Sequence, residues 1–237
     1  MNTAAILLCG GSSKRMRGEV RDKVLVELKE RPVFDYSVLA FEEFEDVTSY
    51  IVVYRDGVQR TELAERLQLL TQRRVLWVEG GEERQESVLN ALEATPDDTD
   101  FVLIHDCARP LVQLLALQEL LDAVLKDKSA CLAHRVVDTI KQVSVNTTTL
   151  RQADLANLDR SRLWAMETPQ AFSYKLILGC YRKLKEESIQ VTDDTAAVIH
   201  YGYRVTLVEN HFPNPKITLP EDLGLAELML QQRDRKA

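Results

Sequence analysis

The stretch Ala4-Ala5-Ile6-Leu7-Leu8-Cys9-Gly10-Gly11, close to the start of the chain, decides how the rest of the sequence is interpreted. Residues 4–9 are a short apolar run that stops at two glycines, a pattern typical of a strand buried on both faces. Small polar and basic residues follow: Ser12, Ser13, Lys14, Arg15 and, further on, Lys23. The glycines and serines let the backbone turn sharply and present N–H groups to an anion, while the cations supply positive charge. The stretch therefore predicts a strand that leads into a phosphate-binding loop.

This predicted loop matches neither of two common nucleotide-binding patterns. A Walker loop is excluded because no Gly-Lys-Ser/Thr stands five residues after the first glycine, and the dinucleotide pattern Gly-x-Gly-x-x-Gly is absent as well. An oxidoreductase that uses NAD is therefore disfavoured. Because a strand followed by two glycines can also be an ordinary turn, the loop needs support from elsewhere in the chain.

The composition is that of an ordinary globular protein with an excess of acidic residues. The 237 residues suffice for one large α/β domain, and 45% of them are hydrophobic and 28% charged. A net charge of −7 argues against a broad surface for nucleic acid or for an acidic membrane. An anionic ligand therefore requires a local cluster of Lys and Arg.

The cysteines and the N-terminus bear on the compartment. The four cysteines lie far apart and include no Cys-x-x-Cys pair, so free thiols in a reducing cytosol are the preferred interpretation. The first residues lack the pattern of a signal peptide, and no apolar run approaches the roughly 18 residues that a membrane span needs. We therefore expect a cytoplasmic protein that does not cross a membrane.

Strand-like and helix-like patterns alternate from residue 4 to residue 135. Strands are predicted at 4–9, 49–54, 74–78, 101–105 and 130–135, and helices at 32–44, 62–70, 87–93 and 115–126. This alternation indicates a mostly parallel, twisted α/β sheet of Rossmann-like type, with right-handed crossovers and helices on both faces. Further helices are expected at 174–185, 192–201 and 220–231, with a late strand at 204–208.

Residues 136–166 interrupt this alternation. Residues 139–145 alternate like a strand exposed on one side, residues 146–149 have the composition of a turn, and residues 150–164 show no convincing apolar face. A long excursion of this kind inside a compact domain is usually functional or part of an interface. We therefore expect one domain over residues 1–237, with a projecting β-arm at about 136–166.

In an open parallel sheet, ligands bind beyond the carboxyl ends of the strands. The residues that follow five of the predicted strands include Gly10, Gly11, Gly80, Gly81, Arg84, Ser87, Asp106, Arg109, Thr139, Lys216 and Thr218. Four of these five strand ends offer Lys or Arg, and Asp106 follows an apolar strand directly. Together they predict a phosphate-binding rim, with Asp106 as a candidate magnesium ligand.

Each of these features has a structural alternative. Asp106 could merely cap a turn, and Gly80-Gly81 with Ser87 could form a plain turn with a helix cap. Thr192-Asp193-Asp194 has the composition of a helix N-terminus, and Arg160-Ser161-Arg162 could be a solvated face. The four histidines show no metal-ligand spacing, and no Ser–His–Asp or Cys–His arrangement supports covalent catalysis.

Seven segments, spread almost from end to end, carry a resemblance to a known family. They are Gly-Gly-Ser-Ser-Lys-Arg-Met (10–16), Gly-Gly-Glu-Glu-Arg-Gln-Glu-Ser-Val (80–88), His-Asp-Cys-Ala-Arg-Pro (105–110), Asp-Thr-Ile-Lys (138–141), Leu-Trp-Ala-Met-Glu-Thr-Pro-Gln-Ala-Phe (163–172), Thr-Asp-Asp (192–194) and Asn-Pro-Lys-Ile-Thr-Leu-Pro-Glu-Asp-Leu (214–223). In this order they resemble the 2-C-methyl-D-erythritol 4-phosphate cytidylyltransferases of the non-mevalonate isoprenoid pathway. The resemblance implies a nucleotidyltransferase fold.

The resemblance also implies roles for the matching residues. The nucleotide would be bound by Gly10, Gly11, Ser12, Ser13, Gly81, Arg84 and Ser87, among which Gly81 and Ser87 would read cytosine. Arg15, Lys23 and Lys216 would be catalytic, and Asp106 would bind Mg²⁺. The methylerythritol phosphate would be held by Arg109, Thr139, Thr192 and Lys216. The family forms a homodimer in which the arms are exchanged, so Arg160 and Thr168 would serve the partner's site.

The implied reaction needs no nucleophile from the enzyme. The phosphate oxygen of the substrate attacks the α-phosphorus of CTP, and pyrophosphate leaves in line. Two anions must be brought together and a negative transition state stabilised, which positioning, cations and magnesium can achieve.

Three features depart from the family pattern and leave alternatives open. Asp22-Lys23-Val24 stands where the family usually has Pro-Lys-Gln, Ser13 replaces a loop glycine, and no acid immediately precedes Asn214. A cytidylyltransferase for ribitol 5-phosphate is therefore one alternative, although Trp164 and the segment 167–172 favour the methylerythritol enzyme. A degenerate, non-catalytic nucleotide-binding subunit is another, and the presence of Arg15, Lys23, Asp106 and Lys216 speaks against it.

Overall fold

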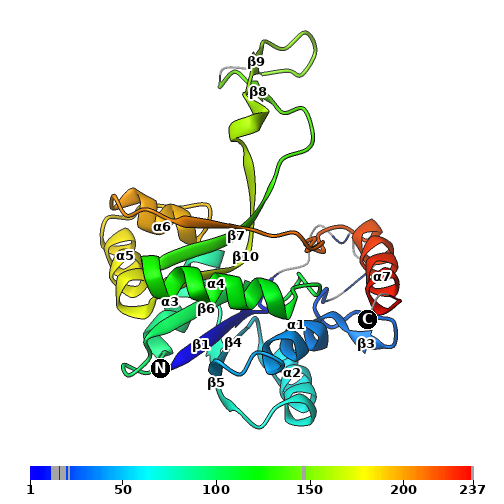
Figure 1. Cartoon of the computed structure of the whole chain (residues 1–237), viewed down its shortest axis with the longest axis vertical. Helices are drawn as coiled ribbons and strands as arrows, with labels where there is room; N and C mark the ends of the chain where they lie inside the picture. The colour runs from blue at the N-terminus through cyan, green and yellow to red at the C-terminus, as the bar shows by residue number, and fades with distance from the viewer. Residues whose placement is uncertain (12–15, 17–19, 21, 146–147, 236–237) are drawn as a thin grey trace.

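A seven-stranded sheet runs through the middle of the molecule, in the strand order β11-β7-β10-β6-β1-β4-β5 (Figure 1). The computed structural model describes residues 1–11, 16, 20, 22–145 and 148–235. The strands are β1 (Thr3–Leu8), β4 (Val47–Tyr54), β5 (Arg74–Glu79), β6 (Phe101–Asp106), β7 (Ser129–Arg135), β10 (Trp164–Ser173) and β11 (Thr206–Glu209). Strand β10 is antiparallel to both of its neighbours, β6 and β7, and the other pairs are parallel. The predicted mostly parallel α/β fold is thus confirmed.

Helices cover both faces of this sheet (Figure 1). They are α1 (Val33–Glu42), α2 (Gly57–Leu70), α3 (Arg84–Ala94), α4 (Leu114–Asp127), α5 (Tyr174–Glu186), α6 (Asp194–His200) and α7 (Glu221–Asp234). Alternate side chains of β1 enter two different cores. Ala5 and Leu7 pack with residues of α1, α2 and α4, whereas Ala4 and Ile6 pack with residues of α3, α5 and α6. The apolar run at residues 4–9 is therefore buried on both faces, as the sequence predicts.

A smaller cluster packs α7 against the β2–β3 hairpin. Strands β2 (Glu27–Leu28) and β3 (Arg31–Pro32) are short and antiparallel, and Leu28 packs with Ala226 and Leu230 of α7. This cluster also contains Ile217, so it supports the loop that carries Lys216.

Strand β10 was not predicted from the sequence. Its central residues are buried but polar: Glu167, Thr168 and Gln170 have no more than 5% of their surface exposed. Pro169 lies within a break in the β7–β10 register, between Met166 and Gln170. Apolar alternation cannot reveal a strand whose buried side chains are held by hydrogen bonds, and a proline argues against a central strand.

The arm leaves the sheet between β7 and β10 and projects far from the rest of the molecule (Figure 1). Strands β8 (Lys141–Val143) and β9 (Leu155–Asn157) form its antiparallel hairpin, and a 3₁₀ helix covers Arg160–Arg162. The sequence anticipated the departure at residue 136 but described residues 150–164 as irregular. That expectation was wrong in part, because β9 and the 3₁₀ helix lie within that range.

No helix in the described part of the chain has the length and apolar character required to span a membrane. The four cysteines are buried free thiols.

Candidate active site

A cavity of about 500 Å³ opens beyond the carboxyl ends of β1, β4, β5 and β6. The residues around it include eight that the sequence predicted for the site: Gly10, Gly11, Lys23, Gly81, Arg84, Ser87, Asp106 and Lys216. They come from segments up to 206 positions apart in the chain, since Gly10 and Lys216 line the same cavity. Ser12, Ser13 and Arg15 lie outside the described residues.

Asp106 ends β6 and lies between two cations. Lys216 Nζ pairs with one carboxylate oxygen, and Arg84 Nε lies 3.3 Å from the other. Burial alone would raise the pKa of Asp106, but the charges of Arg84 and Lys216 outweigh it and hold the pKa well below its ordinary value. The carboxylate is therefore ionised at neutral pH and has the charge and oxygen donors that Mg²⁺ prefers.

Arg84, at the start of α3, connects Asp106 to a second buried acid. Its two terminal nitrogens donate to Asp194 over 3.0 and 2.7 Å, and Tyr181 also donates to that carboxylate. Burial would lower the pKa of Arg84, but Asp194 and Asp106 raise it well above its usual value. Arg84 is thus a fixed cation that holds Asp106 in place and also lines the cavity.

The turn between β5 and α3 depends on two glycines. The Gly81 N–H donates to Ser87 Oγ over 3.0 Å, and that hydroxyl donates to the Glu83 carbonyl. A Cβ on Gly80 would lie 2.9 Å from Ser87 Oγ, and one on Gly81 would lie 2.4 Å from the Cβ of Glu86. Ser87 does not cap α3, because Glu83 and Glu86 form the capping box. Its hydroxyl instead lies at the cavity wall beside the Gly81 backbone.

Lys23 and Lys216 both line the cavity, and the segments that carry them are joined by a hydrogen bond. The Ile217 carbonyl accepts a hydrogen bond from Lys23 Nζ over 3.3 Å, and the Ile217 N–H donates to the Ala108 carbonyl over 2.8 Å. Ile217 directly follows Lys216, which pairs with Asp106. The structure therefore brings Lys23, Lys216 and Asp106 to one end of the cavity.

The predicted substrate residues are more widely dispersed. Arg109 donates to the Asn214 carbonyl over 2.7 Å, and burial lowers its pKa. Thr168 is buried, and its hydroxyl accepts from the Asp106 N–H over 3.1 Å, so it supports the metal-ligand candidate of its own chain. Thr192 is exposed and directly precedes Asp193, whose carboxylate caps α6.

Thr139 and Arg160 lie on the projecting arm. Both are exposed, neither lines the cavity, and Arg160 donates to the Val137 carbonyl over 2.7 Å. One chain thus does not bring these two residues to the site (Figure 1).

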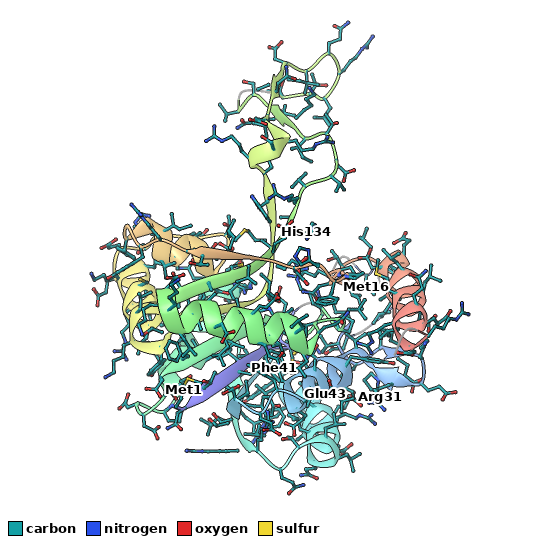
Figure 2. All side chains as sticks on the ribbon, in the orientation of Figure 1. Met1, Met16, Arg31, Phe41, Glu43 and His134 are labelled. Carbon is teal, nitrogen blue, oxygen red and sulfur yellow. The ribbon has the colours of Figure 1, made fainter. Side chains whose placement is uncertain are left out.

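Figure 2 shows His134 at the foot of the arm. Beside it, the buried carboxylate of Glu167 accepts hydrogen bonds from the loop that carries Lys216. His134 Nδ1 lies 2.5 Å from Glu167 Oε1, while Glu167 Oε2 accepts from the side-chain amides of Asn210 and Asn214 over 2.7 and 2.9 Å. No metal-ligand cluster of three or more His, Cys, Asp or Glu exists among the described residues.

Two residues of this site were missed from the sequence. Glu167 was treated only as part of a family segment. Arg55 lines the cavity and directly follows β4, whose carboxyl end was not searched for ligand-binding residues. The same strand-end rule would have found it.

The mostly parallel sheet and the cation-rich cavity beyond its carboxyl ends are those of an α/β protein that binds an anionic ligand. A family model described as 2-C-methyl-D-erythritol 4-phosphate cytidylyltransferase matches residues 3–232, and the chain belongs to this family. The resemblance inferred from the seven segments is thereby confirmed.

Individual relatives agree with this family over nearly their whole length. A 2-C-methyl-D-erythritol 4-phosphate cytidylyltransferase of Caldanaerobacter subterraneus subsp. tengcongensis is 38% identical, with 98% of this chain and 100% of that protein covered. One of Halalkalibacterium halodurans is 35% identical, with 100% of both covered. The solved 4-diphosphocytidyl-2C-methyl-D-erythritol synthase of Anaerococcus prevotii has a TM-score of 0.84 and 25% identity, with 97% of this chain and 98% of that chain covered.

Proposed function

We propose that the protein joins CTP and 2-C-methyl-D-erythritol 4-phosphate to give 4-diphosphocytidyl-2-C-methyl-D-erythritol and pyrophosphate. Family membership over residues 3–232 supports the reaction. The observation that carries the assignment to this cavity is the convergence of Lys23, Lys216 and Arg84 around the ionised Asp106. Because the whole chain has a net charge of −7, a local cluster of cations of this kind would favour the binding of a polyanion at this place.

The cavity suits a direct displacement. A phosphate oxygen of the methylerythritol phosphate forms the new bond to the α-phosphorus of CTP, and the bond to the β-phosphate oxygen breaks, with its electron pair leaving on pyrophosphate. Lys23 and Lys216 would hold the phosphates in line and stabilise the negative charge of the transition state. The glycine turn at Gly81, with Ser87, would receive the cytosine. Arg109 and Thr192 would hold the second substrate.

Magnesium dependence is part of this proposal. One ionised, buried carboxylate at Asp106 fits the usual mode in which Mg²⁺ takes one or two carboxylates together with substrate phosphates. Bound there, Mg²⁺ would neutralise phosphate charge. Asp106 would hold the ion, and Arg84 and the Thr168 hydroxyl keep Asp106 in place.

We also propose a single domain whose arm is exchanged in a homodimer. Val137, Val145 and Leu150 on the arm expose 78%, 94% and 83% of their surface, so the arm offers apolar side chains that another chain could cover. A second chain would cover them and would receive Thr139 and Arg160 at its cavity.

A substrate comparison tests the proposed reaction. The protein is incubated with CTP and Mg²⁺ and either 2-C-methyl-D-erythritol 4-phosphate or ribitol 5-phosphate, and released pyrophosphate is measured. We expect release with the first acceptor and far less with the second. Preference for ribitol 5-phosphate would replace the proposed acceptor, and release with neither would overturn the proposed reaction.

A further inference from the structure

Arg55 is the strand-end residue of β4 that lines the nucleotide cavity and to which the reaction described above gives no role. Strand β4 lies between β1 and β5 in the sheet, so Arg55 stands between the Gly10–Gly11 end and the Gly81 end of the cavity. Asp106 ends β6, on the far side of β1. Arg55 therefore belongs to the half of the cavity that also contains Gly81 and Ser87, away from the Asp106–Lys216 pair.

Two carboxylates fix the orientation of the Arg55 guanidinium. Nε donates to Asp56 over 2.8 Å, and Nη1 lies 3.3 Å from Asp22 Oδ2 and 3.5 Å from the Gly11 carbonyl. Within the described part of the chain, Nη2 makes no hydrogen bond. A guanidinium held on one side by two acids keeps its remaining donors in a fixed direction, which lowers the entropy lost when a ligand binds.

Asp22 is itself held in place from three sides. Its carboxylate accepts from the Val24 N–H over 3.2 Å, from Gln59 Nε2 over 2.5 Å, and pairs with Arg55. Gln59 is buried and also joins the Cys9 carbonyl to the Arg55 N–H. The acid that precedes Lys23 thus points toward Arg55 and Gln59. This pairing accounts for the departure from the family's Pro-Lys-Gln.

We propose that Arg55 is a further nucleotide-contacting residue, which donates hydrogen bonds to acceptor oxygens on the nucleoside half of CTP, and that Asp22 is the residue that positions it. The acceptor is cytosine O2 or a ribose hydroxyl oxygen, both of which take a hydrogen bond from a guanidinium. Because Asp22 and Asp56 together more than offset the single positive charge of Arg55, it acts as an oriented donor and adds little to the attraction of the triphosphate. The inference rests on the proposed placement of CTP.

Steady-state kinetics of Arg55→Gln tests the contact. Loss of a hydrogen bond from a charged donor should raise KM for CTP about tenfold or more, while kcat stays within about twofold and KM for the second substrate does not change. Arg60→Gln is the matched control, because Arg60 lies five residues further on in α2, covers Tyr54 and Trp77, and does not line the cavity. An unchanged KM for CTP in Arg55→Gln would overturn the proposal.

The positioning role of Asp22 is tested with a double-mutant cycle. Asp22→Asn should raise KM for CTP in the wild-type background and add almost nothing to Arg55→Gln, because both changes remove the same contact. Additive effects would overturn the role of Asp22. Thermal unfolding of each variant shows whether a general loss of structure contributes.

Two further comparisons identify the acceptor on CTP and distinguish a failure of this inference from a failure of the proposed nucleotide site. If the ribose 2′-hydroxyl is the acceptor, the wild type prefers CTP to 2′-deoxy-CTP and Arg55→Gln loses that preference. If cytosine O2 or the ribose 3′-hydroxyl is the acceptor, Arg55→Gln impairs both nucleotides equally. Ser87→Ala should raise KM for CTP regardless of Arg55. An effect of Ser87→Ala without one of Arg55→Gln would refute only this inference, whereas no effect of either would refute the placement of the nucleotide.

Discussion

At the scale of single residues, the Asp106–Lys216 pair shows how burial and charge prepare a site for phosphate. Each ion would be costly to bury alone, and together they form a neutral pair with Arg84 as a second counter-charge. An incoming phosphate can take Lys216 as a partner. A cation that is already in position needs little reorganisation during the reaction, which makes such donors effective in catalysis.

Replacement of either lysine should therefore impair turnover with little effect on the fold. We expect Lys23→Ala and Lys216→Ala each to lower kcat by about 10²–10³, the usual loss when one such donor is removed. Lys185→Ala, an exposed position in the last turn of α5, serves as the control. Near-wild-type kcat in a folded variant would remove the assigned role from that lysine.

His105 predicts a dependence of stability on pH. It is fully buried, contacts the Phe41 ring edge-on, and burial lowers its pKa from 6.5 to about 4. The unfolded state therefore binds the proton more tightly, so stability should fall as the pH decreases from about 6.5 to 4, by about 3 kcal/mol in total. Urea unfolding of the metal-free protein across this range measures the effect. His105→Gln cannot titrate and should lose this part of the pH dependence, and an equal dependence in both proteins would contradict the prediction.

At the scale of elements, the strand ends were predictable and β10 was not. The strand at residues 4–9 could be identified because both of its faces are apolar, and the strand-end rule then located Gly81, Asp106 and Lys216 without any knowledge of packing. Strand β10 is central, yet its buried positions are Glu167, Thr168 and Gln170. Their partners are distant in sequence, so no local pattern could show that these side chains are buried.

The polar interior of β10 predicts a large effect of one substitution. Glu167→Leu would remove the acceptor of the buried Asn210 amide and one of the two acceptors of the Asn214 amide, which should cost about 2–4 kcal/mol of unfolding free energy. Because this loop carries Lys216, kcat should fall as well. Glu209→Leu is the matched control, since Glu209 pairs with Arg135 at the surface and such pairs contribute about 1 kcal/mol or less. Equal stability of the two variants in urea would show that Glu167 does not anchor the loop.

At the scale of the whole molecule, the arm and the cavity of one chain are separate. The arm projects away from the sheet (Figure 1). The predicted substrate residues Thr139 and Arg160 lie on it, and neither lines the cavity of the same chain. In a pair of chains related by twofold symmetry, each arm can lie against the cavity of the other chain, because a two-fold interface uses the same two surfaces twice. The apolar side chains of the arm would be buried by the same contact.

Arm exchange predicts recovery of activity when two inactive variants are mixed. Arg160→Ala impairs the arm and Lys23→Ala impairs the cavity, so each homodimer has two defective sites. A mixed dimer has one site with both defects and one with neither. If half of the dimers are mixed after random exchange, about a quarter of the wild-type sites should return. Co-expression with two affinity tags gives the mixed dimer, and pyrophosphate release measures its activity.

A mixture of Lys23→Ala with Lys216→Ala is the control, because both changes lie in the cavity and every site of the mixed dimer stays defective. Recovery in the first mixture alone requires that the arm of one chain complete the cavity of the other. No recovery in an isolated mixed dimer would show that each chain uses its own arm or none.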